Sequence, residues 1–384
     1  MKLKRIFHPV GHGAFYTEQF YSDGNDQPFF TVVFDCGRYE TAKKGWSYAR
    51  YKRELENYIS NDSGLMKGEP INLLFISHFH TDHILGIEYL LKNYKVERII
   101  IPTLTVDIFL DSLYHIKEDE EGLAAIGRFI VKLDNEYKDR ICFVDIQDDG
   151  NNGNGDNDID LLNNGLDNIN SINTCTKLMI HKWYYKPYYK VDTGKRNALH
   201  AEFHRKFPLI FKTNEITFRQ ICKAFKSEGP EAFKDIYANI FGKDKHNSYS
   251  LTLYSGMMCD KICHKQCHIP ANGKITNVQL CTNNCLYMGD YEALNQKQDC
   301  LKEFYTKEWE NIGIMQVPHH GSEHNSNDGL YNMRRRICII SAASDDKYGH
   351  PDQSVINAII NNHSLPVVVS ELRKTKQIFD IQIP

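Results

Sequence analysis

Short apolar and β-branched runs typical of strands alternate with stretches of helical spacing along much of the chain. Strands are predicted over 2–10, 14–20, 29–34, 71–77, 96–101, 312–317 and 337–341. Helices are predicted over 43–59 and 84–94. Because strands alternate with helices, we predict an α/β fold in which helices pack on the faces of sheets.

The composition narrows the class of protein. The chain has 384 residues, a formal net charge of -3, and 41% hydrophobic and 25% charged residues, which is typical of a globular protein and excludes a collagen-like or disordered chain. We expect a single domain over 1–384 that carries an insertion. No apolar run approaches the roughly 18 residues that cross a bilayer, and the first residues lack a signal-peptide core. We therefore expect no membrane association and a cytoplasmic location.

Residues 145–245 depart from the alternating pattern, and we interpret them as the insertion. Residues 145–169 contain seven Asp and no Lys or Arg, which is typical of a solvated acidic loop. Residues 181–245 contain 14 Lys or Arg against 7 Asp or Glu, with helices predicted over 197–207 and 216–225. The aromatic run 183–189 has two interpretations: a platform that stacks on unpaired bases, or a plain strand.

The strongest chemical signal follows the predicted strand. The segment Ser77-His78-Phe79-His80-Thr81-Asp82-His83 places three imidazoles and one carboxylate within six residues. Imidazole nitrogens and carboxylate oxygens are ligands of Zn²⁺ and similar cations. We predict that His78 and His80 bind one ion, and that Asp82 and His83 bind a neighbouring ion.

Further motifs follow in a fixed order. Beside 77–83, they are Val10-Gly11-His12-Gly13, Phe34-Asp35-Cys36-Gly37, Asn247-Ser248-Tyr249-Ser250-Leu251, Tyr287-Met288-Gly289-Asp290, Val317-Pro318-His319-His320-Gly321-Ser322 and Tyr348-Gly349-His350-Pro351. With them the chain resembles the metallo-β-lactamase superfamily, and within it the branch that contains the hydrolase domain of DNA-uptake competence channels. The resemblance covers 1–100 and about 246–365. It implies a four-layer αβ/βα sandwich, with two sheets between outer helices.

The resemblance also implies roles for single residues. Asp290 would bridge both ions, and His246 would complete the first ion's ligands. His350 is expected as the last ligand of the second ion, with His319 as the alternative. We expect two divalent ions, zinc or manganese.

Residues near the ions would take part in the reaction or orient the ligands. Asp82 would orient the nucleophile, and His319 or His320 would protonate the leaving group. Asp35 is either a carboxylate that orients the metal loop or a turn residue. His12 either faces the site or caps its turn.

Five of the 11 cysteines lie within 27 residues: Cys259, Cys263, Cys267, Cys281 and Cys285. Four thiolates at the two ends of a hairpin can hold a structural zinc ion. The alternative is that these cysteines are small buried residues of strands.

Together these features predict a two-metal-dependent hydrolase, a phosphodiesterase or nuclease whose substrate is a nucleic acid or a nucleotide. The branch resemblance and the basic aromatic segment favour nucleic acid. The same fold permits an acyl hydrolase that acts on a lactone, lactam or thioester. A metal-stabilised binding protein without catalysis is the third alternative.

Overall fold

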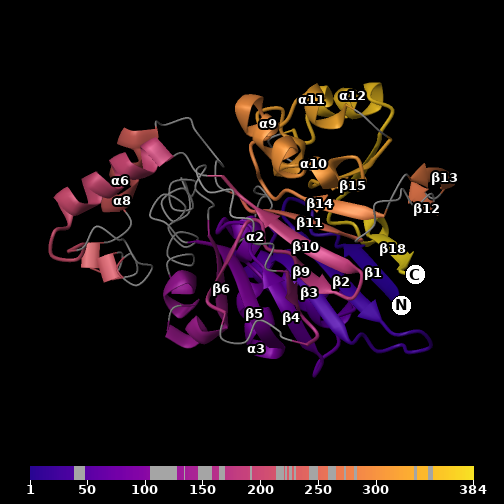
Figure 1. Cartoon of the computed structure of the whole chain (residues 1–384), viewed down its shortest axis with the longest axis horizontal. Helices are drawn as coiled ribbons and strands as arrows, with labels where there is room; N and C mark the ends of the chain where they lie inside the picture. Colours follow the sequence, from indigo (N-terminus) through magenta and orange to yellow (C-terminus); the bar gives the residue numbers. More distant parts are fainter. Residues whose placement is uncertain are drawn as a thin grey trace.

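The computed structural model describes residues 1–38, 48–103, 128–133, 135–145, 158–163, 169–190, 193–212, 220, 223–224, 227–228, 231–241, 250–257, 265–271, 274–280, 283–332, 335–344 and 349–384. Within these ranges the chain forms two eight-stranded sheets and a separate two-stranded hairpin (Figure 1). No helix in this part of the chain is long and apolar enough to cross a membrane.

The strand order of both sheets shows that each is built from distant parts of the chain. The first sheet runs β18 (Gln377–Gln382), β1 (Lys2–Phe7), β2 (Phe15–Tyr21), β3 (Phe30–Cys36), β4 (Pro70–Phe75), β5 (Lys95–Pro102), β6 (Ile141–Asp145) and β8 (Ser171–Asn173). The second runs β17 (Leu365–Val369), β16 (Ile337–Ser341), β15 (Ile312–Gln316), β14 (Asn284–Tyr287), β11 (Thr252–Met257), β10 (Trp183–Tyr188), β9 (Leu178–Ile180) and β7 (Ile159–Asp160). The hairpin pairs β12 (Lys265–Ala271) with β13 (Lys274–Leu280).

Helices cover the outer faces of the two sheets. Figure 1 shows α9 (Asn295–Phe304), α10 (Thr306–Trp309), α11 (Asp328–Tyr331) and α12 (Gln353–Asn361) on one side, and α3 (Ile87–Asn93) on the other. In β15, Ile314 packs into the core between the sheets, whereas its neighbour Met315 packs into the core beneath these helices. This four-layer α/β arrangement confirms the predicted fold class.

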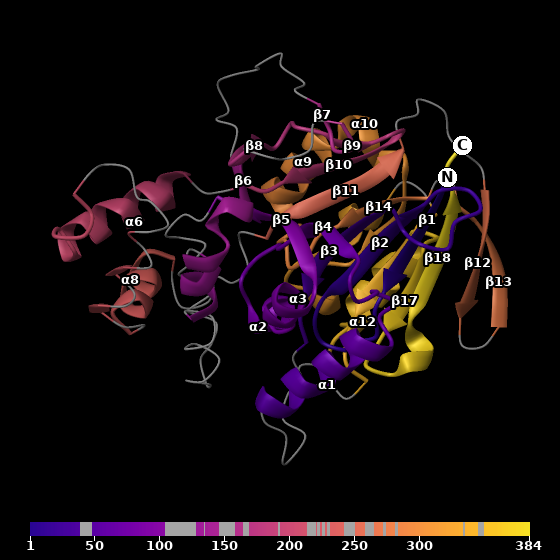
Figure 2. The ribbon, with the colours of Figure 1, turned by 90° about the horizontal axis from the view of Figure 1, so that it is seen from below.

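Two further helices lie at one side of the sandwich. Figure 2 shows α6 (Thr193–Lys206) and α8 (Glu231–Phe241) beyond β6, while α1 (Tyr48–Asn61) lies beneath the first sheet. Phe203 of α6 and Phe233 of α8 are buried, with ring centroids 5.4 Å apart, so the two helices share an apolar contact. The predicted helices 197–207 and 43–59 correspond to α6 and α1, although 39–47 and most of 216–225 lie outside the described residues.

The predicted helix 84–94 corresponds to α3, which begins only at Ile87. A separate short helix, α2 (Thr81–Ile84), starts within the histidine motif and ends where the predicted helix begins. The break falls at Gly86, where an added Cβ would lie 2.6 Å from the Sγ atom of Cys36 on β3. This close approach requires glycine and holds α2 against the end of β3.

The described part of 145–245 contributes strands to both large sheets. β8 extends the first sheet, and β10 pairs with β11 in the second. The aromatic residues of this stretch are buried, since Trp183, Tyr185 and Tyr189 are each at most 1% exposed. The strand interpretation of the aromatic run therefore holds, and these three rings are not available to stack on bases.

A buried ion pair joins the first sheet to the second. Arg5 Nε lies 2.6 Å from Glu18 Oε1, and the two side chains are 0% and 3% exposed. The hydroxyl groups of Tyr185 and Tyr287 donate to Glu18 at 2.6 and 2.8 Å. Because β1 and β2 carry the pair and β10 and β14 carry the tyrosines, this cluster fixes how the two sheets face one another.

Candidate metal centre

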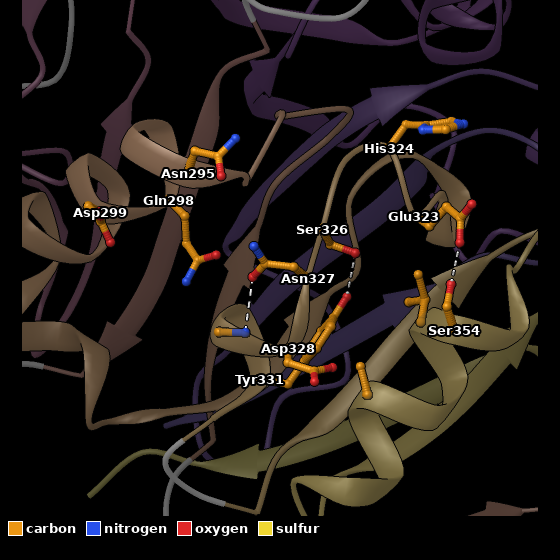
Figure 3. A pocket seen from close by; sticks show the side chains of 13 residues that line it. Asn295, Gln298, Asp299, Glu323, His324, Ser326, Asn327, Asp328, Tyr331 and Ser354 are labelled. Atoms are coloured by element: carbon orange, nitrogen blue, oxygen red, sulfur yellow. Dashed lines mark hydrogen bonds between the residues drawn. The ribbon is translucent and has the colours of Figure 1, made fainter.

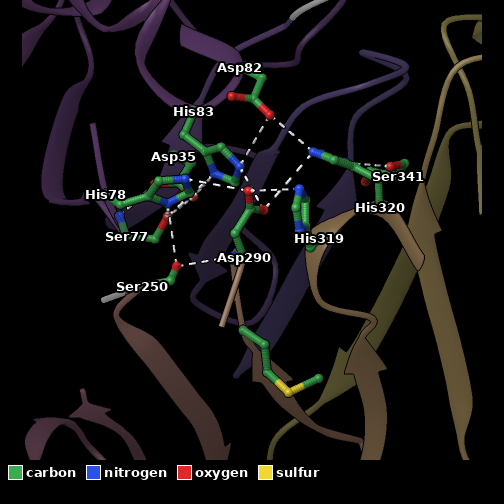
Figure 4. Close-up of polar contacts among 12 residues, drawn as sticks. Asp35, Ser77, His78, Asp82, His83, Ser250, Asp290, His319, His320 and Ser341 are labelled. Carbon is green, nitrogen blue, oxygen red and sulfur yellow. Dashed lines mark hydrogen bonds and ion pairs between the residues drawn. The ribbon is translucent and has the colours of Figure 1, made fainter. Parts of the chain in front are cut away.

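The histidine motif and two later loops meet at one edge of the sandwich (Figure 4). β3 and β4 are parallel neighbours in the first sheet, and β14 and β15 are parallel neighbours in the second. The carboxyl ends of parallel strands lie at the same edge of a sheet. Residues 77–83 follow β4, Asp290 follows β14, and His319 and His320 follow β15.

Two groups of candidate ligands share one carboxylate. The first contains His78, His80 and Asp290, and the second contains Asp82, His83, Asp290 and His320; within each group the donor atoms lie within 4.8 Å of one another. Oδ2 of Asp290 is 3.5 Å from His78 Nε2, and its Oδ1 is 3.0 Å from His83 Nε2. Asp290 therefore stands between the groups, with one oxygen toward each.

In two rings of this centre, those of His83 and His320, the Nδ1 atom is held by a group that accepts its hydrogen. His83 Nδ1 lies 2.8 Å from Asp35 Oδ2, and His320 Nδ1 lies 2.8 Å from the carbonyl oxygen of Ser341. A carboxylate and a carbonyl can only accept, so each Nδ1 carries the proton and donates it. The lone pair on Nε2 is then directed toward Asp82 and Asp290, as it is in histidines that bind metals.

The same reasoning extends to His78 through Ser77. Asp35 accepts from the backbone N–H and from the hydroxyl group of Ser77, both at 2.7 Å. The hydroxyl hydrogen is thereby used, so Ser77 Oγ accepts from Nδ1 of His78 at 2.9 Å. Asp35 thus orients the ring of His83 directly and the ring of His78 through Ser77. Of the two roles considered for Asp35, these contacts fit a carboxylate that orients the metal loop.

This arrangement fits divalent cations. Nε2 of His320 lies 3.0 Å from Asp82 Oδ2, and Nε2 of His83 lies 3.0 Å from Asp290 Oδ1. In both pairs a ring nitrogen faces a carboxylate oxygen, so either a second proton on the ring or a cation has to lie between the two atoms. Imidazole nitrogen and carboxylate oxygen are borderline and hard donors of the kind that zinc and manganese bind.

The electrostatics of the centre favour positive charge. Burial opposes the charged form of both carboxylates, yet His83 foremost holds the pKa of Asp82 and Asp290 well below its ordinary value. Burial also lowers the pKa of His83, but Asp290 and Asp82 raise it well above its usual range. The pKa of His320 is raised as well, because its hydrogen bond to Asp82 outweighs burial.

His319 differs from the other rings of the centre. Burial lowers its pKa although Asp290 opposes this, and its side chain is 25% exposed, against 3% for His320. Its Nδ1 lies 2.6 Å from Asn325 Oδ1, and Nε2 lies 3.9 Å from Asp290 Oδ2. Asn325 Nδ2 donates to the Asp290 carbonyl, so its oxygen faces His319.

Backbone strain turns both residues of the His-His pair into the site. Adjacent residues of an extended strand point to opposite sides, but these two residues are not extended. His319 and His320 have left-handed backbone, with φ of 45° and 55°. His320, which we expected as a candidate proton donor, lies within the second ligand group.

His350 lies beside the centre rather than in either ligand group. Its ring centroid is 6.1 Å from that of His12 and 6.2 Å from that of His319. Its Nδ1 is 3.4 Å from Asp352 Oδ2. His12 itself faces the site, with its ring centroid 3.7 Å from that of His320, and burial foremost lowers its pKa.

The remaining predicted ligands are placed in part. His246, Cys259, Cys263 and Cys281 lie outside the described residues, and for Cys267 only its place on β12 is described. Cys285 is buried on β14, where burial raises its thiol pKa to about 12. No candidate ligand group in the described part of the chain includes it.

Sequence reasoning missed the residues that hold the loops. Gln316 accepts from the backbone N–H groups of Met288 and Gly289 at 2.6 and 2.7 Å, and donates to the carbonyl of Val317 at 2.6 Å. It thereby ties the Asp290 loop to the His319 loop. Ser250 Oγ accepts from the N–H of Asp290 at 3.0 Å. Nothing in the sequence indicated the contacts of Gln316, whereas Ser250 lies within the motif 247–251.

Comparison with known proteins supports part of the expected relationship. A family model described as the metallo-beta-lactamase superfamily matches residues 30–164. The match includes Asp35 and the histidine motif, and it ends before Asp290. No curated protein matches the chain significantly.

Proposed function

We propose that this chain, which carries a metallo-beta-lactamase superfamily domain, is a hydrolase that uses two divalent cations to cleave phosphodiester bonds of a nucleic acid or a nucleotide. The observation that carries the proposal is the position of Asp290 between two ligand groups. A shared anionic oxygen donor offsets the repulsion between two neighbouring cations.

The residues that would hold the cations are divided by Asp290. His78 and His80 would hold one ion and Asp82, His83 and His320 the other, with Asp290 shared. When bound, the two ions supply a nucleophile at neutral pH and stabilise charge on the phosphoryl oxygens.

The chain's own residues fix orientation and move a proton. Asp82 is held by His320 at 3.0 Å, so its carboxylate has a fixed direction toward the centre. His319 is the more exposed ring, and Asn325 fixes its Nδ1 proton, so Nε2 is the atom that would carry a proton to the leaving alkoxide. His319 is therefore our choice as general acid.

Charge supports an anionic substrate over a neutral lactam or ester. Two divalent cations would exceed the charge of the three carboxylates of the centre, which are Asp35, Asp82 and Asp290. A site with excess positive charge attracts and stabilises a phosphodiester. The resemblance to the competence-channel branch favours the same class of substrate. The aromatic run does not, because its rings are buried.

The test is turnover by the metal-loaded chain on single-stranded DNA, duplex DNA, RNA, a cyclic dinucleotide and a chromogenic lactam. Asp290→Ala, purified in parallel, measures any contaminating nuclease. Cleavage of a phosphodiester by the wild type alone supports the proposal. Hydrolysis of the lactam alone would establish the acyl hydrolase, and metal binding without turnover on any substrate would establish a binding protein.

A further inference from the structure

A cavity of about 780 Å³ lies between α9, α11 and α12 (Figure 3). A loop links it to the metal centre: Asn325 contacts His319 and the Asp290 carbonyl, and the next residue in sequence, Ser326, lines the cavity. Its volume is within the range of small-molecule sites. One loop thus carries both a wall of the cavity and the proposed general acid.

Most side chains that line the cavity are polar, and its three carboxylates outnumber its one basic side chain, His324. Asp299, Glu323 and Asp328 supply carboxylates, and no lysine or arginine stands among the described residues that line it. Carboxylate oxygens only accept hydrogen bonds, so they suit a ligand rich in donors. A phosphate group would be repelled here, whereas an uncharged group with amino or hydroxyl hydrogens would be favoured.

Gln298 points its amide into this cavity. The side chain is only 7% exposed, and Figure 3 shows it extending from α9 toward Asn327. No hydrogen-bond partner for this amide is found within the described part of the chain. The amide itself opens onto the cavity, so a ligand bound there can donate to it and accept from it.

Gly329 leaves the space that the amide occupies. A Cβ at this position would lie 2.5 Å from Nε2 of Gln298. The neighbouring side chain of Asn327 is already used, since its Oδ1 accepts from the N–H of Gly329 at 3.0 Å. Gln298 is thus the buried amide that remains available to a ligand.

We propose that this cavity binds the nucleoside part of the substrate, that is, a base with amino groups and a sugar with hydroxyl groups. The proposal rests on the proposed function, because a nucleotide presents a neutral nucleoside beside its phosphodiester. A glutamine amide can donate to and accept from one edge of adenine. The positive metal centre takes the phosphate, and the acidic cavity takes the uncharged group next to it.

The experiment measures binding of unphosphorylated adenosine to the full metal-loaded chain by calorimetry, with glucose as a second ligand. Gln298→Leu removes the amide, and Gly329→Ala displaces it while favouring the helix. Each variant is expected to weaken adenosine binding about tenfold, the cost of leaving a buried polar group unsatisfied. Gln353→Leu, which changes an exposed glutamine on α12, is the matched control and should bind like the wild type.

The outcomes separate this inference from the proposed function, because adenosine has no phosphodiester bond and its binding is measured without hydrolysis. Adenosine binding that both variants weaken supports the cavity, whether or not a phosphodiester is hydrolysed. No adenosine binding, or equal binding by wild type and both variants, overturns the cavity even if hydrolysis is found. Binding of glucose without adenosine also overturns it and indicates a site for free sugars. Thermal unfolding of each variant verifies that the fold is retained.

Discussion

Replacing Asp35 with Asn tests whether the outer hydrogen bonds prepare the rings for a cation. Asp35 has φ of 53°, a conformation that Asn adopts readily, so the backbone should not change. The amide oxygen of Asn at position 35 would accept from the N–H of Ser77, because in the flipped orientation the amide N–H₂ group would face this N–H, and both groups are donors. The amide nitrogen would then occupy the place of Oδ2 and face His83 Nδ1.

This substitution reverses the direction of the hydrogen bond between residue 35 and His83 Nδ1. The amide N–H₂ donates where the carboxylate accepted, so His83 must carry its proton on Nε2, which is the atom aimed at Asp290. A proton there blocks cation binding. The amide nitrogen also removes the acceptor of the Ser77 hydroxyl group, which contacts His78 Nδ1. His78 is less affected than His83, since Ser250 Oγ lies 3.3 Å from its Nδ1 as a second acceptor. The loss should therefore concentrate on the ligand group that contains His83.

Loss of such an outer partner lowers metal affinity roughly 10–100-fold, which is about 1.4–2.7 kcal/mol. The assay is a zinc titration against a chromophoric chelator, fitted to two sites. Asp380→Asn is the matched control, because Asp380 forms an exposed ion pair with Lys2 and belongs to neither ligand group. Two unchanged affinities in Asp35→Asn would refute the assignment of Asp35 as the group that sets the ring tautomer.

Three further predictions concern the carboxylates of the centre, the ring of His83 and the buried ion pair of Arg5 and Glu18. Asp290→Ala and Asp82→Ala should each abolish hydrolysis while circular dichroism stays unchanged, because each removes a carboxylate ligand of the proposed cations; turnover near that of the wild type would refute the site. The neighbouring carboxylates raise the pKa of His83, so a proton competes with a cation for its Nε2. Cation affinity should therefore fall as the pH is lowered, and cation binding should release protons. Calorimetry in buffers of different ionisation enthalpy measures this release, and no release would contradict the prediction. Glu18→Gln should destabilise the fold by about 3–5 kcal/mol, because Arg5 is left as an uncompensated buried charge; denaturant unfolding measures it, and a change under about 1 kcal/mol would show that the pair is dispensable.

The fold class and the place of the histidine motif could be predicted from sequence because both depend on local pattern. Apolar runs marked β4 and β15, and 78–83 followed the first of them directly. The structure brings this motif beside Asp290, and cation binding by these residues stays a prediction. The position of Gly86 was visible in the sequence, but its close approach to Cys36, which divides the helix, was not.

Other features depend on contacts between distant segments and left no local signal. Adjacent residues of a strand alternate in direction, but His319 and His320 both adopt left-handed backbone, and both rings face the centre. Gln316 lies within an apolar strand, and only the folded loops show why a polar side chain is needed there. The aromatic run 183–189 could not be assigned to a core or a surface before β10 was known to lie between β9 and β11.

The central claim, two cations around Asp290, is tested most directly by elemental analysis of the zinc-loaded chain after dialysis. Cys259, Cys263, Cys267 and Cys281 are first changed to Ser, so that no thiolate site contributes metal. We predict two zinc ions per chain, one for each ligand group, and at most one in Asp290→Ala of the same background. No stoichiometric zinc, or the same zinc content in both proteins, would contradict the account.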